Sequence, residues 1–276
     1  MLSLKRLLLI SRPVSYLPTA AIFAAGILKS HSGWSWGAAL VTLYFTVPFG
    51  LVAYGINDIA DREADAKNKR KGGIDGAALH AREVLPLSRI VAAIALVCPL
   101  LLWAGGHPVS AVFMAGLSLL SWAYSTRPVR LKSLPGIDSI SNGVGILLIY
   151  LTGYLWQGAA SGAVLPGLPL MCTILLFAAG VHAMGAVADI TADRQAGDRT
   201  IGTVLGKTKT LLLCASAFAA CYILIGRHHF VTGAYLLGCA ALVLIASRVR
   251  RPRFVRNSGL LIIIAFPLAM LPAVFR

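Results

Sequence analysis

The stretch YGINDIADREADAKNKRK occupies residues 54–71 and follows a nearly uninterrupted apolar run at residues 35–56. The whole chain has only ten acidic residues, and four of them fall within eight positions of this stretch, at 58, 61, 63 and 65. Acids this scarce, gathered where an apolar segment ends, indicate a place where the chain passes from an apolar environment into water. The stretch therefore guides the prediction of both fold and function.

The composition predicts an all-α integral membrane protein. The mean hydropathy is +0.79 and 13% of the 276 residues are charged, whereas a soluble domain carries about 25%. Apolar runs near the ~20 residues that cross a bilayer as a helix recur along the chain. They cover residues 13–30, 35–56, 88–106, 108–125, 138–157, 165–188, 208–226, 230–247 and 258–275. We expect nine transmembrane helices in one bundle, forming a single domain over residues 1–276, with a central cavity open to the cytoplasmic side.

The distribution of basic residues sets the expected orientation. The net charge of +15 would by itself be compatible with nucleic-acid binding. With the N-terminus inside, nine spans leave residues 1–12, 57–87, 126–137, 189–207 and 248–257 in the cytoplasm. Of the 25 lysines and arginines, 22 fall there or within the first two residues of the span that follows. Loops rich in Lys and Arg stay inside. We therefore predict a protein of a bacterial plasma membrane, with a cytoplasmic N-terminus, an external C-terminus and no nucleic-acid partner.

A second acidic stretch resembles the first. DITADRQA at residues 189–196 aligns with NDIADREA at residues 57–64, and each begins at the cytoplasmic end of a predicted span. An internal helical repeat would explain the match and would set the two acidic clusters opposite each other. Within each stretch, polar residues four positions apart share one helix face. These residues are Asn57, Asp61, Asp65, Asp189 and Asp193.

The two stretches predict a magnesium site. Like charges four residues apart destabilise a helix by roughly a few tenths of a kcal/mol per pair, so a helix that accepts such pairs is expected to bind a cation. The candidate ligands are hard oxygen atoms, and Mg²⁺ binds one or two carboxylates together with substrate phosphates. An EF-hand calcium loop is excluded because its Asp-x-Asp-x-Asp-Gly spacing is absent. The alternative, acids of a solvated loop, would explain one cluster more readily than two matched clusters.

A diphosphate at the mouth of an apolar bundle points to an isoprenyl diphosphate, whose head is anionic and whose tail is apolar. Mg²⁺ would stabilise the departing diphosphate. The remaining allylic cation would need a dry pocket with aromatic faces, and Tyr124 is one candidate, although aromatic residues of spans also serve in packing and interfacial belts. Basic side chains would neutralise the remaining phosphate charge. The candidates are Arg62, Arg194, Arg199, Lys207, Arg127, Arg130 and Lys132.

The paired motifs NDIADREAD (57–65) and DITADRQAG (189–197) resemble those of the intramembrane prenyltransferase superfamily that contains UbiA. Nine helices, the positive-inside pattern and YSTRPVRLK at residues 124–132 are similar too, so the likeness covers nearly the whole chain. The resemblance implies prenyl transfer from an allylic isoprenyl diphosphate to an apolar acceptor, with Mg²⁺ as cofactor. It implies that the five aligned motif residues bind the metal and diphosphate. The residues expected to be catalytic are Asp61, Asp193, Arg130 and Lys132, and Arg127 would help to bind the phosphates.

Four further stretches resemble the lycopene elongase branch, which adds five-carbon prenyl units to carotenoid ends. They are SRPVSYLPTAAIFAAG (11–26), RKGGIDGAALHARE (70–83), DSISNG (138–143) and HAMGAVADITADRQAGDRTIGTVLG (182–206). The branch tends to carry bulkier residues where this chain has Ala60 and Ala64. The resemblance implies dimethylallyl diphosphate as donor and a terminal alkene of lycopene as nucleophile. The resulting tertiary cation would lose a proton or capture water.

Three polar residues within the predicted spans are candidates for substrate binding, since such residues are functional by default in membranes. Asp138 and Asn142 are four positions apart near the start of the span at 138–157, although Asp138 could instead cap that helix. His182 lies seven residues before Asp189 on roughly the same face, and it could equally be a packing residue.

Other functions remain open. Within the superfamily, the acceptor could be an aromatic ring such as 4-hydroxybenzoate or a naphthoate, a chlorophyllide or a sugar phosphate. A transporter of Mg²⁺ or of an organic anion belongs to a different class, but transporters place ionic sites near the midplane on interrupted helices, whereas these acids lie at the cytoplasmic ends of spans. A non-catalytic scaffold would need no paired acidic motifs. The sequence leaves the oligomeric state open.

Overall fold

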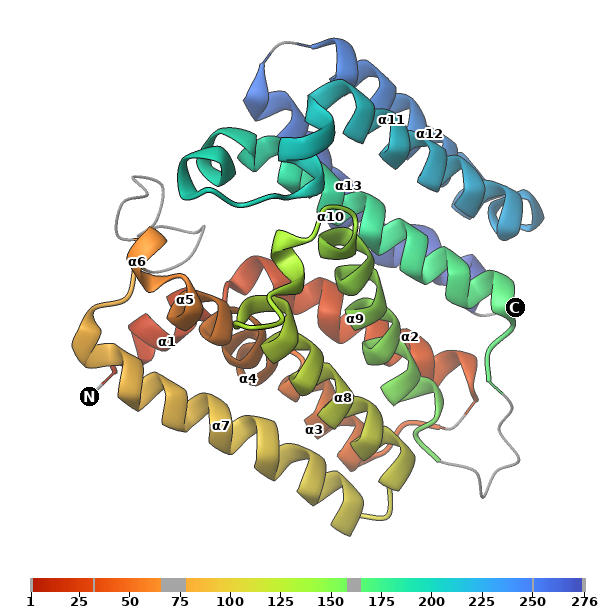
Figure 1. Ribbon diagram of the computed structural model, residues 1–276. Helices are drawn as coiled ribbons and strands as arrows, with labels where there is room; N and C mark the ends of the chain where they lie inside the picture. The colour runs from red at the N-terminus through yellow and green to blue at the C-terminus, as the bar shows by residue number, and fades with distance from the viewer. Residues whose placement is uncertain (1, 32, 66–77, 158–164, 250, 275–276) are drawn as a thin grey trace. The chain divides into compact units, whose positions relative to one another are not determined.

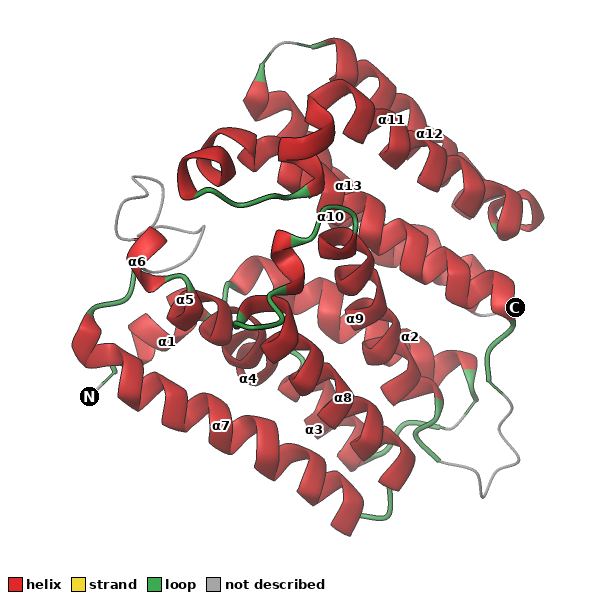
Figure 2. Ribbon diagram, in the orientation of Figure 1, coloured by secondary structure: helices red, strands yellow, loops and turns green. Residues whose placement is uncertain are grey.

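The computed structural model describes residues 2–31, 33–65, 78–157, 165–249 and 251–274. Every secondary-structure element within these ranges is helical (Figures 1 and 2), which confirms the all-α prediction. The helices form two compact units: Met1–Arg130 with Leu148–Leu165, and Leu131–Leu147 with Pro166–Arg276. Each unit is described by itself, and the single domain over residues 1–276 stays a prediction.

The first unit contains the N-terminal helices. They are α1 (Leu4–Ile10), α2 (Tyr16–Lys29), α3 (Trp36–Tyr44), α4 (Val47–Gly50), α5 (Ile56–Ala60), α6 (Arg62–Asp65), α7 (Ala81–Ala104), α8 (Pro108–Ser125) and the end of α9 (Ile137–Tyr154). A turn at Phe45 and Thr46 separates α3 from α4, and a π-helical turn at Leu51–Gly55 joins α4 to α5. Together these helices form one apolar segment, Trp36–Ala60, that is long enough to cross a membrane. The axes of the α1 segment and the α2 segment are bent by 58°, and Arg12 between them has a left-handed φ of 53°.

Polar side chains at the N-terminal ends of α3 and α7 fix where these two helices begin. The Ser35 hydroxyl accepts a hydrogen bond from Ala38 N at 3.1 Å, which is the usual way to satisfy the first turn of a helix. The Glu83 carboxylate accepts one from His80 N at 2.8 Å and pairs with Arg6 at 2.7 Å. Helix α7 therefore begins seven residues before the predicted apolar run at 88–106, because its first turn is capped and tied to α1.

Two glycines let α2 and α9 approach closely. A Cβ atom built on Gly26 would lie 2.3 Å from the Tyr150 carbonyl oxygen, and one built on Gly153 would lie 2.2 Å from the Phe23 carbonyl oxygen. Small residues at such crossings allow backbone contact between membrane helices. The rings of Phe23 and Trp156 meet beside this crossing with centroids 5.9 Å apart. This end of α9 is therefore packed into the core of the first unit.

The second unit contains the start of α9 and four long helices. They are α10 (Leu168–Ala196), α11 (Ile201–Leu224), α12 (Phe230–Arg248) and α13 (Pro252–Val274). Helix α10 packs along α11 and α13, and α12 packs against both α11 and α13, as the green-to-blue part of Figure 1 shows. Phe177 of α10 stacks on Phe266 of α13 with ring centroids 4.5 Å apart. Gly206 interrupts α11 with φ 73° and ψ 171°, a conformation open to glycine.

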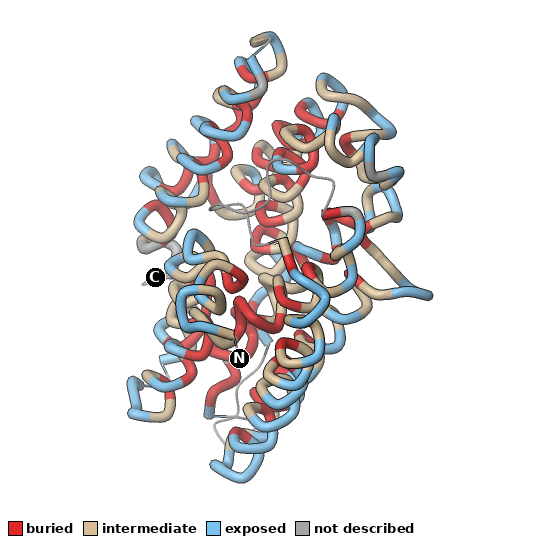
Figure 3. Tube along the Cα trace, turned by 90° about the vertical axis from the view of Figure 1, so that its left-hand side faces the viewer, coloured by how far each residue is buried: buried red, intermediate tan, exposed pale blue. Residues whose placement is uncertain are grey.

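The described helices supply seven segments that are long and apolar enough to cross a membrane, or eight if α1 and α2 form one bent span. The nine spans and the central cavity open to the cytoplasm are therefore not confirmed. The predicted span at 138–157 corresponds to α9, whose first two turns carry Asp138, Ser139, Ser141 and Asn142. In α7, only 17% of the most apolar 18-residue window is buried. Figure 3 shows buried and exposed positions alternating along the helices, and an apolar exposed face of this kind suits contact with lipid.

Candidate functional site

The first acidic motif lies where the apolar segment Trp36–Ala60 ends. Helix α5 stops at Ala60, and Asp61 has φ −100° and ψ 4°. The backbone still keeps helical bonding, because Asp61 N donates to Asn57 O at 2.9 Å and Asp65 N donates to Asp61 O at 2.8 Å. Asn57, Asp61 and Asp65 are thus one turn apart, as their four-residue spacing predicts. Of the predicted acidic loop 57–87, residues 57–65 are mostly helical and residues 66–77 lie outside the described residues.

Arg130 brings a cation to the first motif. Its Nη2 lies 3.2 Å from Asp61 Oδ1, and its Nη1 donates to the Ser125 carbonyl oxygen at 3.5 Å. The Ser125 hydroxyl accepts a hydrogen bond from Asn57 Nδ2 at 3.4 Å. Arg130 has φ 42°, so the chain turns through a left-handed conformation as it leaves this unit. The end of α8 therefore contacts the amide of the motif through Ser125, and the loop after α8 contacts a carboxylate through Arg130.

Three other predicted residues of this unit are Arg62, Arg127 and Tyr124. Arg62 pairs with its neighbour Glu63 at 3.3 Å, and the Glu63 side chain is 86% exposed. Arg127 is exposed in the loop after α8, and Tyr124 is half-buried in the last turn of that helix. Their contacts with a substrate remain predictions.

Arg12, which the sequence did not single out, forms an ion pair next to the first motif. Its Nη2 lies 3.1 Å from Asp58 Oδ1, and the Asp58 side chain is 0% exposed. The Arg12 guanidinium also lies over the Tyr54 ring, 4.4 Å from the centroid, in a cation–π arrangement. A signal was present, because an acid at the end of an apolar helix needs a cation. Arg12 is the basic residue that precedes the first predicted span.

The second acidic motif lies on the last turns of α10. Asp189 and Asp193 sit on uninterrupted helix, and the helix ends at Gly197, which has φ 76°. Asp198 N donates to Asp193 O at 2.9 Å, and Gly197 N donates to Arg194 O at 3.2 Å, a bonding pattern typical of helix C-termini that end in glycine. The predicted loop at 189–207 is thus helical up to Ala196 and again from Ile201, with a short connection between.

Hydroxyl groups contact the acids of this connection. Thr200 Oγ1 donates to Asp193 Oδ2 at 3.0 Å, and Ser133 Oγ donates to Asp198 Oδ1 at 3.2 Å. Lys132, beside Ser133, is buried with 8% of its surface exposed. The segment that follows the first unit therefore brings Lys132 into the unit that holds the second motif, while its role with phosphates stays a prediction.

The side chains of Asp138 and His182 both form hydrogen-bond contacts with other residues of the second unit. Asp138 Oδ1 accepts hydrogen bonds from Gly136 N at 2.8 Å and Ser139 N at 2.9 Å, and Oδ2 accepts one from Ile201 N at 2.9 Å. Asp138 therefore binds backbone N–H groups at the start of α9 and at the first residue of α11. His182 Nδ1 lies 3.1 Å from Ser139 Oγ. Binding of substrate by Asp138 and His182 stays a prediction.

The remaining predicted residues of the second unit are spread over its surface. Arg194 is exposed in the last turn of α10, where a cation complements the helix dipole. Lys207 donates from its ammonium group to the Val249 carbonyl oxygen, at the end of α12. Asn142 is exposed on α9.

The donor set fits Mg²⁺ with a phosphate group. Each motif offers carboxylate oxygens one turn apart, and the first adds the amide oxygen of Asn57. Among the described residues, no three His, Cys, Asp or Glu side chains gather in an arrangement that could hold a metal. A protein cage is not needed for Mg²⁺, which uses one or two carboxylates and completes its shell with water and phosphate.

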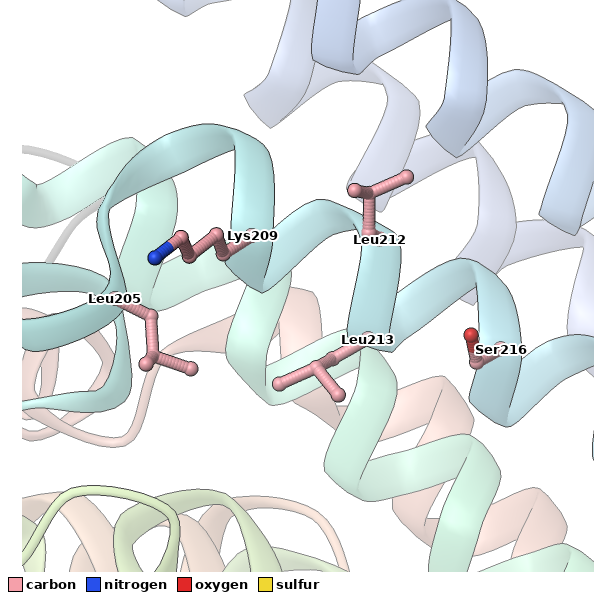
Figure 4. Close-up of a pocket in the computed structure, with 5 residues that line it drawn as sticks. All are labelled: Leu205, Lys209, Leu212, Leu213 and Ser216. Carbon is pink, nitrogen blue, oxygen red and sulfur yellow. The ribbon is translucent and has the colours of Figure 1, made fainter.

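A hollow on α11 lies apart from both motifs. It has a volume of about 340 Å³ and is shown in Figure 4. Its lining residues all come from one exposed face of α11, and they are Leu205, Lys209, Leu212, Leu213 and Ser216. No residue of an acidic motif contributes to it, so the predicted site is not in this hollow.

Known proteins share both sequence and fold with the chain. Residues 16–266 match the UbiA prenyltransferase family. A lycopene elongase/hydratase of Haloarcula japonica is 34% identical over 244 residues, which are 86% of this chain and 79% of that protein. The C(50) beta-cyclic carotenoids biosynthesis protein LbtBC of Dietzia sp. is 31% identical over 219 residues, which are 78% of this chain. The match spans 49% of the Dietzia protein, about half of its length.

A solved structure has the same fold. A UbiA homolog from Archaeoglobus fulgidus, bound to DMAPP and Mg²⁺, superposes with a TM-score of 0.74 over 98% of this chain and 99% of that one. Its sequence is 19% identical, so this likeness concerns the fold alone. The family match, in contrast, covers most of the sequence and includes both acidic motifs. The chain therefore belongs to the UbiA prenyltransferase family, a family of integral membrane proteins.

Proposed function

We propose that this chain is a Mg²⁺-dependent enzyme that transfers a dimethylallyl group from dimethylallyl diphosphate to the end of lycopene or a related carotenoid. The observation that carries the proposal is the pair of acidic motifs at the ends of long apolar helices. The 34% identity to a lycopene elongase/hydratase supports a carotenoid as the acceptor. The DMAPP and Mg²⁺ in the homolog from Archaeoglobus fulgidus support the donor and the cofactor.

In the first motif, Asn57, Asp61 and Asp65 would bind Mg²⁺ and the donor's diphosphate. The contact between Arg130 and Asp61 at 3.2 Å supports a role for Arg130 in binding phosphate oxygens, since guanidinium groups bind them in pairs of hydrogen bonds.

In the second motif, Asp189 and Asp193 would take the same role. Lys132 would add positive charge toward the phosphates, and a compact ammonium group suits that task. When bound, Mg²⁺ would act as a Lewis acid that stabilises the negative charge on the departing diphosphate.

The transfer breaks one C–O bond of the donor and forms one C–C bond to the acceptor. The C1–O bond of the donor breaks, and both of its electrons leave with the diphosphate. The π electrons of the acceptor's terminal alkene form the new C–C bond to the allylic carbon. The resulting tertiary cation would either lose a proton to form an alkene, or capture water and then release a proton to form an alcohol, with the diphosphate or solvent as the proton acceptor. The apolar helices would exclude other water from the allylic cation, and Tyr124 is the proposed aromatic neighbour.

We also propose nine transmembrane helices, with α9 and the bent α1–α2 segment completing the set. The acids and most of the basic residues would then lie in the cytoplasm, in keeping with the positive-inside rule. The N-terminus would be cytoplasmic, in a bacterial plasma membrane.

The acceptor is tested in a bacterium that produces lycopene. The wild-type chain is expressed beside Asp61→Asn and beside Glu63→Gln, which makes the same change of charge at an exposed position of the same motif. We expect carotenoids heavier by one or two prenyl units, detected by mass spectrometry, with the wild type and Glu63→Gln but not with Asp61→Asn. Unchanged lycopene, with the protein present in the membrane, would contradict the carotenoid acceptor and direct the search to aromatic rings.

A further inference from the structure

The connection between α10 and α11 is fixed by a buried carboxylate from another helix. Asp138, at the start of α9, is 1% exposed, and its Oδ2 accepts a hydrogen bond from Ile201 N at 2.9 Å. Its Oδ1 accepts two more from Gly136 N and Ser139 N, at 2.8 and 2.9 Å. One carboxylate thus anchors the first residue of α11 to the first turn of α9.

Thr200, the residue before Ile201, makes two contacts with its hydroxyl group. It accepts a hydrogen bond from Thr203 N at 3.3 Å, which caps α11. It donates to Asp193 Oδ2 at 3.0 Å. A hydroxyl has one proton to donate and lone pairs to accept with, so both contacts form together. Capping α11 needs only the lone pair, and the donated bond to Asp193 is a separate interaction.

We propose that Thr200 and Asp138 are positioning residues for Asp193: the Thr200 hydroxyl orients the Asp193 carboxylate, and Asp138 fixes the backbone that carries Thr200. The proposal rests on the proposed role of Asp193 as a ligand of Mg²⁺. Partners that hydrogen-bond a ligating carboxylate fix its orientation and raise metal affinity.

The test measures metal binding directly and separately from turnover. Purified protein with inorganic pyrophosphate is titrated with Mn²⁺, and free Mn²⁺ is followed by electron paramagnetic resonance. Thr200→Val removes the hydroxyl at nearly constant volume, and Thr200→Ser keeps it. Ser35→Ala is the control, because it removes the cap of α3, whose hydroxyl accepts from Ala38 N at 3.1 Å and contacts no acid of either motif.

We expect Thr200→Val to weaken Mn²⁺ binding by about tenfold, the low end for loss of such a partner. Thr200→Ser should bind as the wild type does. Ser35→Ala should lower the melting temperature and leave Mn²⁺ affinity unchanged. A Thr200→Val protein that melts earlier but binds Mn²⁺ as the wild type does would show that Thr200 only caps α11, and would overturn the proposal.

Asp138→Asn tests the second link. With the amide oxygen bound to Gly136 N and Ser139 N, the NH2 group faces Ile201 N, which loses its acceptor. The start of α11 is then no longer held, so Mn²⁺ affinity should fall, as we expect for Thr200→Val. In the double variant Asp138→Asn/Thr200→Val, the loss should be smaller than the product of the two single losses, because both act through one carboxylate. If the loss of Mn²⁺ affinity in the double variant equals the product of the two single losses, Asp138 and Thr200 do not act through the same carboxylate. If Asp138→Asn does not fold, the comparison of Thr200→Val with Thr200→Ser decides.

Failure of the positioning role of Thr200 can be distinguished from failure of the proposed function. Wild-type protein that binds Mn²⁺ with pyrophosphate but transfers no prenyl group to any carotenoid would contradict the acceptor, while the Thr200 comparison would still decide the positioning role. Wild-type protein that binds no Mn²⁺ under these conditions would overturn both.

Discussion

Arg12 and Asp58 form an ion pair at 3.1 Å in which the carboxylate side chain is 0% exposed. The pair joins the end of α1 to α5, directly beside Asn57. Removing one partner of a buried pair leaves an uncompensated charge in a low-dielectric environment, and this costs about 3–5 kcal/mol. We therefore expect Arg12→Gln to lower the free energy of unfolding by about that amount, measured by denaturant titration in mixed micelles.

Two further variants test the cause of that loss. Arg62→Gln removes an arginine whose partner Glu63 is 86% exposed, and such pairs contribute about 0–1 kcal/mol, so its stability should hardly change. Adding Asp58→Asn to Arg12→Gln removes the stranded charge and should recover part of the loss. If the double variant is no more stable than Arg12→Gln, the unpaired carboxylate is not the cause.

The start of α11 leaves no room for a side chain at Gly202. A Cβ atom there would lie 2.5 Å from the Ala186 carbonyl oxygen, so Gly202→Ala must push α11 away from α10 next to the second motif. We expect a loss of about 1–3 kcal/mol, as for other overpacked sites. Gly185→Ala is the matched control on α10, because nothing lies within 4 Å of its Cβ position. It should be neutral or stabilise by up to about 1 kcal/mol. Equal melting temperatures for the two variants would contradict the close approach.

Arg130 combines a left-handed backbone, φ 42°, with its contact to Asp61. Arg130→Asn keeps a residue that tolerates this conformation and removes the guanidinium. We expect the KM for the prenyl donor to rise at least about tenfold, equivalent to ~1.4 kcal/mol. Arg130→Lys should recover only part of this, since an ammonium group lacks the planar pair of donors. An unchanged KM in Arg130→Asn would remove Arg130 from the donor site.

The fold class and the positions of the acids could be predicted because they depend on local pattern. Apolar runs of membrane length gave the helices, and four-residue spacing gave the shared faces of Asn57, Asp61 and Asp65. Helix boundaries were less accurate where polar residues continue a helix. Helix α10 runs to Ala196, eight residues beyond the predicted run at 165–188, because its last turns carry the second motif and end at Gly197.

The contacts between helices that support the site could not be predicted from the spacing of residues along one helix. Arg12 and Asp58 are 46 positions apart, and Asp138 and Ile201 are 63 apart. Neither pair follows from helical spacing, because each joins different helices through tertiary packing. Asp138 was predicted either to bind substrate or to cap its helix, and the sequence could not show that its oxygens accept hydrogen bonds from Gly136 N, Ser139 N and Ile201 N. The nine predicted spans stay a prediction, because the described helices supply seven or eight segments that meet the length and hydropathy of a span.

Removal of divalent cations tests the cofactor. Treatment with EDTA should abolish prenyl transfer, and added Mg²⁺ should restore it, because in the proposed site the motif oxygens would bind the diphosphate through the metal. Calcium, which prefers more ligands and longer bonds, should restore less. Turnover that persists after chelation would exclude a Mg²⁺-dependent donor site.

The most direct test of the central claim uses the purified protein in lipid vesicles with labelled dimethylallyl diphosphate, Mg²⁺ and lycopene. Label that enters the carotenoid fraction is measured after chromatography for the wild type, Asp61→Asn and Glu63→Gln. We predict transfer by the wild type and Glu63→Gln, and loss of transfer in folded Asp61→Asn protein. Transfer by Asp61→Asn at the wild-type rate would contradict the assignment of the acidic motifs to the donor site.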